Sequence, residues 1–126
     1  MRIPPLHILV VSQPWAWAIF HGGRDVVNRD WSTRFRGRVA IHAPHAMDSA
    51  AVDWLADWFG LLVPPDLPRG QTVGTVRIVD CVSDSDSPWF EGPHGLVLRD
   101  PRSHAVEARP VPVNRAWCAP AEVAHA

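Results

Sequence analysis

The stretch of sequence that decides the fold is SQPWAWAIFHGGRDVVNRDWSTRFRGRVAIH, residues Ser12–His42. It begins with a predicted helix over residues 14–21, because Pro14 is favoured in the first helical turn and Ser12 can cap it. Short strands are predicted over residues 24–29 and 38–43, with a polar loop between them. This stretch combines aromatic faces with hydrogen-bonding side chains at a density found nowhere else in the chain.

Strand patterns dominate the rest of the chain. Further strands are predicted over residues 6–12, 71–82, 95–99 and 105–113. Gly74 indicates a bend or bulge in the longest of them. One clear helix is predicted over residues 47–59, capped by Asp48 or Ser49 and ended by Gly60. Strands that do not alternate with helices predict an α+β fold, a small β-barrel of about five to six strands with two flanking helices.

Composition narrows the class of protein. The chain has 126 residues, so one domain is expected over residues 1–126. Its net charge of −1 argues against strong binding of duplex DNA, which needs a basic face. No signal peptide or membrane span is recognisable, so we expect a cytoplasmic protein. Cys81 and Cys118 have no zinc-site spacing, and we expect neither a metal nor another cofactor.

Four candidate ligand-binding residues lie in the first half of the deciding stretch: Gln13, Trp15, Asn28 and Arg29. Arg29 beside Asn28 can hold a phosphate or a base edge, or can be a structural arginine paired with Asp25, Asp30 or Asp80. Gln13 and Trp15 stand at a helix start, where free N–H groups suit an acceptor-rich ring. Capping and core packing are the alternatives for these two.

Trp31 and Arg36 are candidates in the second half. Trp31 lies in a polar loop, where an aromatic ring can cover a pocket or stack on a ligand. Arg36 alternates with Arg34 and Arg38, which gives either a phosphate-binding rim or a solvated basic face.

Two further residues are candidate general bases. His42 can move a proton, although a hydrogen-bonded core histidine is the more common case. Asp80 is expected on the apolar face of its strand, where burial would raise its pKa, although pairing with Arg29 is the preferred role. We find no Ser-His-Asp spacing and no glycine-rich phosphate loop.

The chain resembles the ASCH domain family of the PUA-like superfamily. The resemblance rests on QPWA after Ser12, on GGRDVVNRDW at residues 22–31, on RG at 36–37 and on IHA at 41–43. It continues through VGTVRIVDCV, SPWFEGPHGLVLRDP and PVPVNRAW, and so covers nearly the whole chain.

This resemblance implies a PUA-like barrel with a cleft between barrel and helices, and an association with RNA or modified nucleosides. By position, the QPW turn, Asn28, Arg29, Trp31 and the strand near Asp80 would line the cleft. Some members are ribonucleases, and one group deacetylates N4-acetylcytidine with a Lys-Thr-Glu set. This chain has no lysine, and its Arg24 and Val27 stand where that group has Lys and Thr.

We therefore expect a nucleic-acid-associated binding module that recognises RNA or a modified nucleotide in the cleft. Its partners would be RNA, a nucleotide or a modified nucleoside, and no membrane. The alternative is a small hydrolase, a ribonuclease or a modified-nucleoside amidohydrolase, with Asp80 or His42 as general base. Whether the protein is an enzyme and which oligomeric state it adopts stay open at this level.

Overall fold

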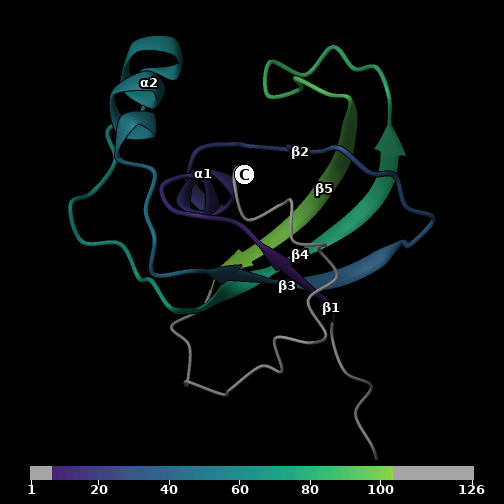
Figure 1. Cartoon of the computed structure of the whole chain (residues 1–126), viewed down its shortest axis with the longest axis horizontal. Coiled ribbons are helices and arrows are strands. Elements are labelled where there is room, and N and C mark those ends of the chain that lie inside the picture. The colour runs from purple at the N-terminus through teal and green to yellow at the C-terminus, as the bar shows by residue number, and fades with distance from the viewer. Residues whose placement is uncertain (1–6, 104–126) are drawn as a thin grey trace, which may run out of the picture.

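A computed structural model of the protein describes residues 7–103. In chain order the elements are β1 (His7–Val10), α1 (Trp15–His21), β2 (Val26–Arg29), β3 (Gly37–Ala43), α2 (Ser49–Phe59), β4 (Gln71–Val82) and β5 (His94–Ser103). The strands form one curled, half-barrel sheet with the two helices beside it (Figure 1). The α+β barrel-like fold predicted from sequence is confirmed. The strand predicted over residues 105–113 lies outside the described residues.

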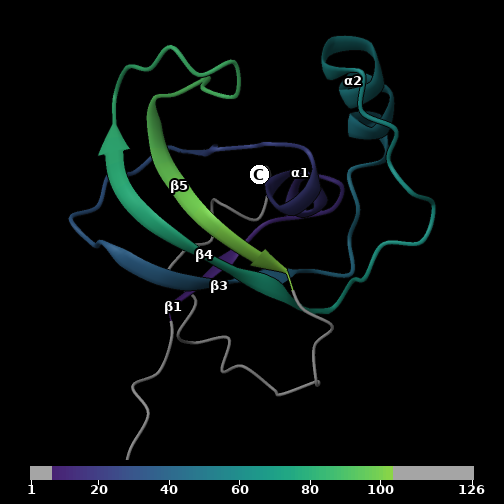
Figure 2. The same ribbon diagram turned by 180° about the vertical axis from the view of Figure 1, so that it is seen from behind.

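The sheet has the order β1-β3-β4-β5-β2. β1 runs parallel to β3, and the other neighbours are antiparallel. Seen from behind, β3, β4 and β5 lie side by side as the strongly curved part of the sheet (Figure 2). Register shifts at Ile41/His42, Thr75/Arg77 and Ile78/Asp80 accompany this curvature, because bulges increase strand twist and bending.

Gly74 lies beside the first register shift, where its lack of a side chain matters. A Cβ at this position would come within 2.6 Å of the Arg102 carbonyl oxygen and of the Phe20 ring. The register shift confirms the bend or bulge predicted at Gly74, and the absence of a side chain there lets β5 and α1 approach closely.

The helices bury their apolar faces in two connected clusters. Ala16 and Ile19 of α1 pack into the sheet core, together with inward residues such as Leu9, Val76 and Leu96. Leu55 of α2 packs in a second cluster with Ala18, Val26 and Trp89. α2 is thus held against α1 and against the loop between β4 and β5. Neither helix in the described range has the length and apolar character needed to cross a bilayer.

The prediction that Ser12 and Asp48 cap the two helices through their side chains is wrong. Ser12 does not cap α1; the Gln13 side-chain oxygen accepts the Trp17 N–H at 2.9 Å instead. Asp48 stands at the N-cap position of α2 but makes no side-chain cap bond. Gly60 ends α2 in the left-handed conformation, with φ of 65°, as predicted.

Candidate functional site

A cavity of about 330 Å³ lies between the two helices, β2 and the β4–β5 loop. Figure 1 shows α2 standing opposite that loop, with α1 and β2 beneath them. Its polar lining consists of Arg24, Asn28, Asp48 and Glu91. Its remaining lining is Trp15, Ala50, Ala51, Trp54, Pro88 and Trp89. The volume is at the small end of the range of ligand pockets, about 300–1,000 Å³.

Arg24 is the most unusual residue of this lining. It is only 4% exposed, and its Nε donates to the Val26 carbonyl at 2.9 Å. Its Nη1 is buried and has no hydrogen-bond partner among the described residues. Burial first, and then the charge of Arg29, lowers the pKa of Arg24 to about 9, while Glu91 acts to raise it. Arg24 therefore stays a cation at neutral pH, buried and without an ion pair to any residue of the range 7–103.

Tryptophan rings form the walls around this cation. The Arg24 guanidinium carbon lies 5.3 Å from the centre of the Trp15 ring, within cation–π range. Trp15 and Trp54 are 5.4 Å apart between ring centroids. Trp15 is fixed by its Nε1, which donates to the Asp48 carboxylate at 3.0 Å. Such rings offer flat apolar surfaces on which a planar ligand can stack.

The opposite wall is the β4–β5 loop, and Asn28 holds it in place. The Asn28 side-chain nitrogen donates to the Trp89 carbonyl at 3.0 Å. Its side-chain oxygen accepts the N–H groups of Glu91 at 2.7 Å and Gly92 at 3.1 Å. Trp89 is also stacked on Phe59 of α2, with centroids 3.9 Å apart. The loop is therefore tied to both β2 and α2, and the cavity is largely preformed.

The cavity offers both hydrogen-bonding polarities. Arg24 supplies positive charge, whereas Asp48 and Glu91 supply carboxylate acceptors. The lining can therefore meet both acceptors and donors of a ligand. Within residues 7–103 no group of three or more His, Cys, Asp and Glu side chains is arranged to hold a metal ion.

The structure places two of the six predicted ligand-binding residues, Trp15 and Asn28, in this lining. Gln13 is 1% exposed, and besides capping α1 its nitrogen donates to the Pro68 carbonyl at 3.0 Å. It lines a second cavity, of about 320 Å³, against Trp17 and the connector after α2. The side chain of Gln13 thus joins α1 to that connector.

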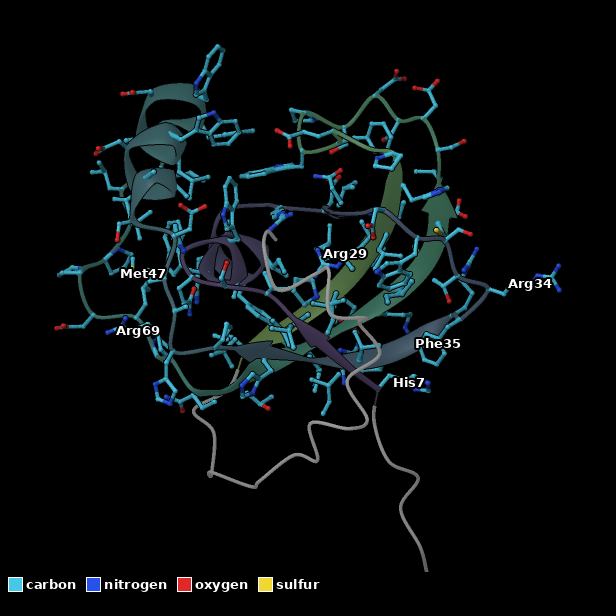
Figure 3. All side chains as sticks on the ribbon, in the orientation of Figure 1. His7, Arg29, Arg34, Phe35, Met47 and Arg69 are labelled. Atoms are coloured by element: carbon cyan, nitrogen blue, oxygen red, sulfur yellow. The ribbon has the colours of Figure 1, made fainter. Side chains whose placement is uncertain are left out.

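Arg29 lies inside the curled sheet (Figure 3) and is 4% exposed. Its Nη1 donates to the Asn28 carbonyl and its Nη2 to the Val10 carbonyl, both at 2.8 Å. These bonds join β2 to β1 across the interior of the barrel. Arg29 does not line the cavity.

Trp31 and Arg36 also lie away from the cavity lining. Trp31 is half-buried and packs against the main core cluster. Arg36 is exposed and donates to the carbonyls of Thr33 and Phe35. Its Nη2 lies 3.4 Å from the Asp80 carboxylate.

The preferred partner of Asp80 was wrong: Asp80 pairs with Arg36, not with Arg29. The register shift between Ile78 and Asp80 is the physical reason, because it interrupts the alternation that would have placed Asp80 on the inner face. Ile78 is buried, whereas Asp80 is exposed. Burial, and then the charge of His45, lowers the pKa of His42.

Neither candidate general base, Asp80 or His42, lines the cavity. Val27, for which the resemblance to the ASCH family implies a threonine in one group of members, is fully buried in the main core cluster. This arrangement gives no specific support to the hydrolase alternative.

Sequence reasoning missed Arg24, Asp48, Trp54 and Glu91 as cavity residues. One signal was present for Arg24, because it lies in the stretch on which the resemblance to the ASCH family rests, at a position where that resemblance implies a lysine. For Trp54 the signal was its position four residues before Trp58 on a predicted helix, as a second ridge beside the apolar stripe. Asp48 and Glu91 come together only through tertiary contacts and carry no local signal.

The chain is similar to activating signal cointegrator 1 of Homo sapiens, with 32% identity over 116 aligned residues that span 74% of this chain and 20% of the relative. The Mus musculus protein of the same name is 35% identical over 82 residues, 60% of this chain and 14% of its own length. The chain thus spans a fifth or less of these relatives. No protein-family model matches the chain.

Proposed function

We propose that the chain is a single ASCH domain and a nucleic-acid-associated binding module, whose cavity takes the base of a nucleotide or modified nucleoside, free or within single-stranded RNA. The observation that carries this proposal is Arg24, a cation in a tryptophan-walled cavity that is buried and has no ion pair within the described part of the chain. The motif resemblance and the curled half-barrel sheet support the family assignment.

The chemistry of a nucleobase matches this lining. A base has a flat π-face, which Trp15 or Trp54 can cover, and stacking contributes about 1–3 kcal/mol per base. A base edge also carries both acceptors and donors, which the Arg24 cation and the carboxylates of Asp48 and Glu91 can meet. A plain apolar ligand would leave these charged groups buried and unpaired, at a cost in affinity.

A thermal-shift screen tests the proposal. Nucleosides, nucleotides and short single-stranded RNAs are added to the full chain, and the unfolding temperature is followed. A specific ligand at about a hundred times its Kd stabilises by about 2.7 kcal/mol, a shift of several degrees in a domain of this size. No shift across the panel would contradict the proposal.

Two variants localise a positive result. Trp54→Leu removes a ring from the cavity wall, whereas Trp58→Leu removes a ring from the same helix that is 73% exposed and absent from the lining. We expect the first variant to lose at least tenfold in affinity, the equivalent of one stacked base, and the second to bind like the wild type. Equal losses would show that binding does not occur in this cavity. Arg24→Met serves as a second cavity variant that keeps all tryptophans.

A further inference from the structure

A row of arginines crosses the outer face of the curved part of the sheet. Arg38 of β3 is opposite Arg77 of β4, and Arg77 is opposite Arg99 of β5. The neighbours Val76, Ile78 and Leu98 are buried in the core, so by strand alternation Arg77 and Arg99 point to the other face. Both are exposed. We call Arg38, Arg77 and Arg99 the arginine row.

The described residues of this region contain fewer carboxylates than arginines. Asp100 pairs with both Arg38 and Arg102, the latter at 2.9 Å. The Asp80 carboxylate pairs with Arg36, whose Nη2 lies 3.4 Å from Oδ1. In the described part of the chain, Arg77 and Arg99 have no ion pair. Among residues 7–103, five arginines therefore share two carboxylates, and neither carboxylate pairs with Arg77 or Arg99.

This arrangement is unfavourable for the sheet by itself. Neighbouring strands are about 4.7–4.9 Å apart, and like charges directly opposite each other are destabilising. An anion from outside the chain would relieve the repulsion. Guanidinium groups bind phosphate through two parallel N–H···O bonds, which makes arginine well suited to this anion.

We propose that the arginine row binds the phosphodiester backbone of single-stranded nucleic acid, separately from the cavity. The choice of nucleic acid over another polyanion rests on the proposed function. The surface itself also favours nucleic acid over a protein partner. A protein interface is typically anchored by an apolar or aromatic side chain in a pocket, and none of these arginines lines either of the two cavities described above. Asp48 and Glu91 in the cavity lining repel phosphates, so the backbone must be held elsewhere.

The expected binding is weak and modestly salt-dependent. Each phosphate contact with a single strand contributes about −0.7 to the slope of log K against log salt concentration. Arg38 is already paired with Asp100, so two contacts, from Arg77 and Arg99, give a slope of about −1.4. This is far from the steep slope of a protein that contacts many phosphates, and it agrees with the near-neutral net charge of −1.

The test is a titration of a labelled twelve-residue oligouridylate by fluorescence anisotropy, at salt concentrations rising from 20 mM. The variant Arg77→Gln/Arg99→Gln removes two contacts, so its slope should flatten by about 1.4, with about tenfold weaker binding at low salt. The matched control is Arg34→Gln/Arg69→Gln, which removes the same charge from exposed arginines outside the row. Figure 3 shows Arg34 and Arg69 at opposite sides of the molecule.

Three outcomes would overturn the proposal. The first is no binding by the wild type at 20 mM salt, and the second is equal weakening of binding in both double variants. The third is binding of poly-glutamate of equal charge as tightly as the oligonucleotide, which would indicate an acidic polypeptide as partner. Thermal unfolding checks the fold of Arg77→Gln/Arg99→Gln, whose midpoint should not fall below that of the wild type because a like-charge contact is removed.

The same variants separate this inference from the proposed function. Nucleoside binding in the cavity should be unchanged in Arg77→Gln/Arg99→Gln. Conversely, Arg24→Met should keep the salt slope of the oligonucleotide while it loses nucleoside binding. If no nucleoside binds but the arginine row behaves as described, the proposed function fails and this inference stands.

Discussion

Replacing Arg24 with methionine removes the buried cation of the cavity and keeps a long side chain in its place. A pKa lowered from 12.5 to about 9 corresponds to about 5 kcal/mol of unfavourable free energy for keeping the charged form in the folded protein. The variant loses the bond from Nε to the Val26 carbonyl, worth about 1–3 kcal/mol once that carbonyl is stranded. It also loses the cation–π contact with Trp15, about 1 kcal/mol.

The balance predicts that Arg24→Met is more stable than the wild type by about 2 kcal/mol at pH 7. Stabilisation on removal of a polar residue is typical of a site kept for binding rather than for folding. Urea unfolding followed by far-UV circular dichroism measures the difference. If the variant were instead less stable by about 1 kcal/mol or more, Arg24 would be a structural residue and the reasoning would be refuted.

The pH dependence of the free energy of unfolding tests independently whether the pKa of Arg24 is lowered. Above pH 9 the folded wild type releases the Arg24 proton while the unfolded chain still holds it, so wild-type stability rises with pH. The advantage of Arg24→Met should therefore be constant below pH 9 and shrink above it by up to about 1.4 kcal/mol per pH unit. A constant difference from pH 7 to pH 10 would contradict a lowered pKa at this residue.

Three further changes test the supports of the cavity and the sheet. Asn28→Ala leaves the N–H groups of Glu91 and Gly92 without their acceptor, so the free energy of unfolding should fall by about 2 kcal/mol and nucleoside affinity should fall with it; unchanged unfolding in urea would contradict this role. Gly74→Val places a Cβ against backbone and should cost about 1–3 kcal/mol by the same assay, whereas tolerance would mean that the bulge can widen. The lowered pKa of His42 means that the unfolded chain binds its proton first, so stability should fall as the pH drops below 6.5, and His42→Gln should flatten that fall. An identical pH profile in the variant would assign the acid sensitivity to other groups.

The strand and helix pattern could be predicted because it is local. The apolar residues of 38–43 and 71–82 predicted these two strands, Gly60 predicted the end of α2, and Gly74 predicted the bulge in β4. The long β5 could not be bounded, because Asp100 and Pro101 interrupt a strand pattern that continues beyond them to Ser103. Asp100 adopts a φ of 53° there, at the register shift that lets the strand continue.

The site was only partly predictable, for a different reason. Trp15 and Asn28 were found because they belong to one short stretch with a recognisable order. Asp80 was misplaced because a single register shift moves a side chain to the other face, and sequence alternation cannot reveal it. Arg29 has the composition of a ligand-binding residue, yet its guanidinium bonds main-chain carbonyls inside the barrel. Only tertiary contacts distinguish it from Arg24.

The most direct test of the central claim, that the cavity between α2 and the β4–β5 loop binds a nucleobase, is nuclear magnetic resonance of the tryptophan indole N–H groups. A nucleoside that gives a thermal shift is titrated into ¹⁵N-labelled protein, and the signals are assigned by single substitutions. We predict that the signals of Trp15, Trp54 and Trp89 move together and saturate, while that of exposed Trp58 moves least. Saturating shifts confined to Trp17, which lines the second cavity, would contradict the claim.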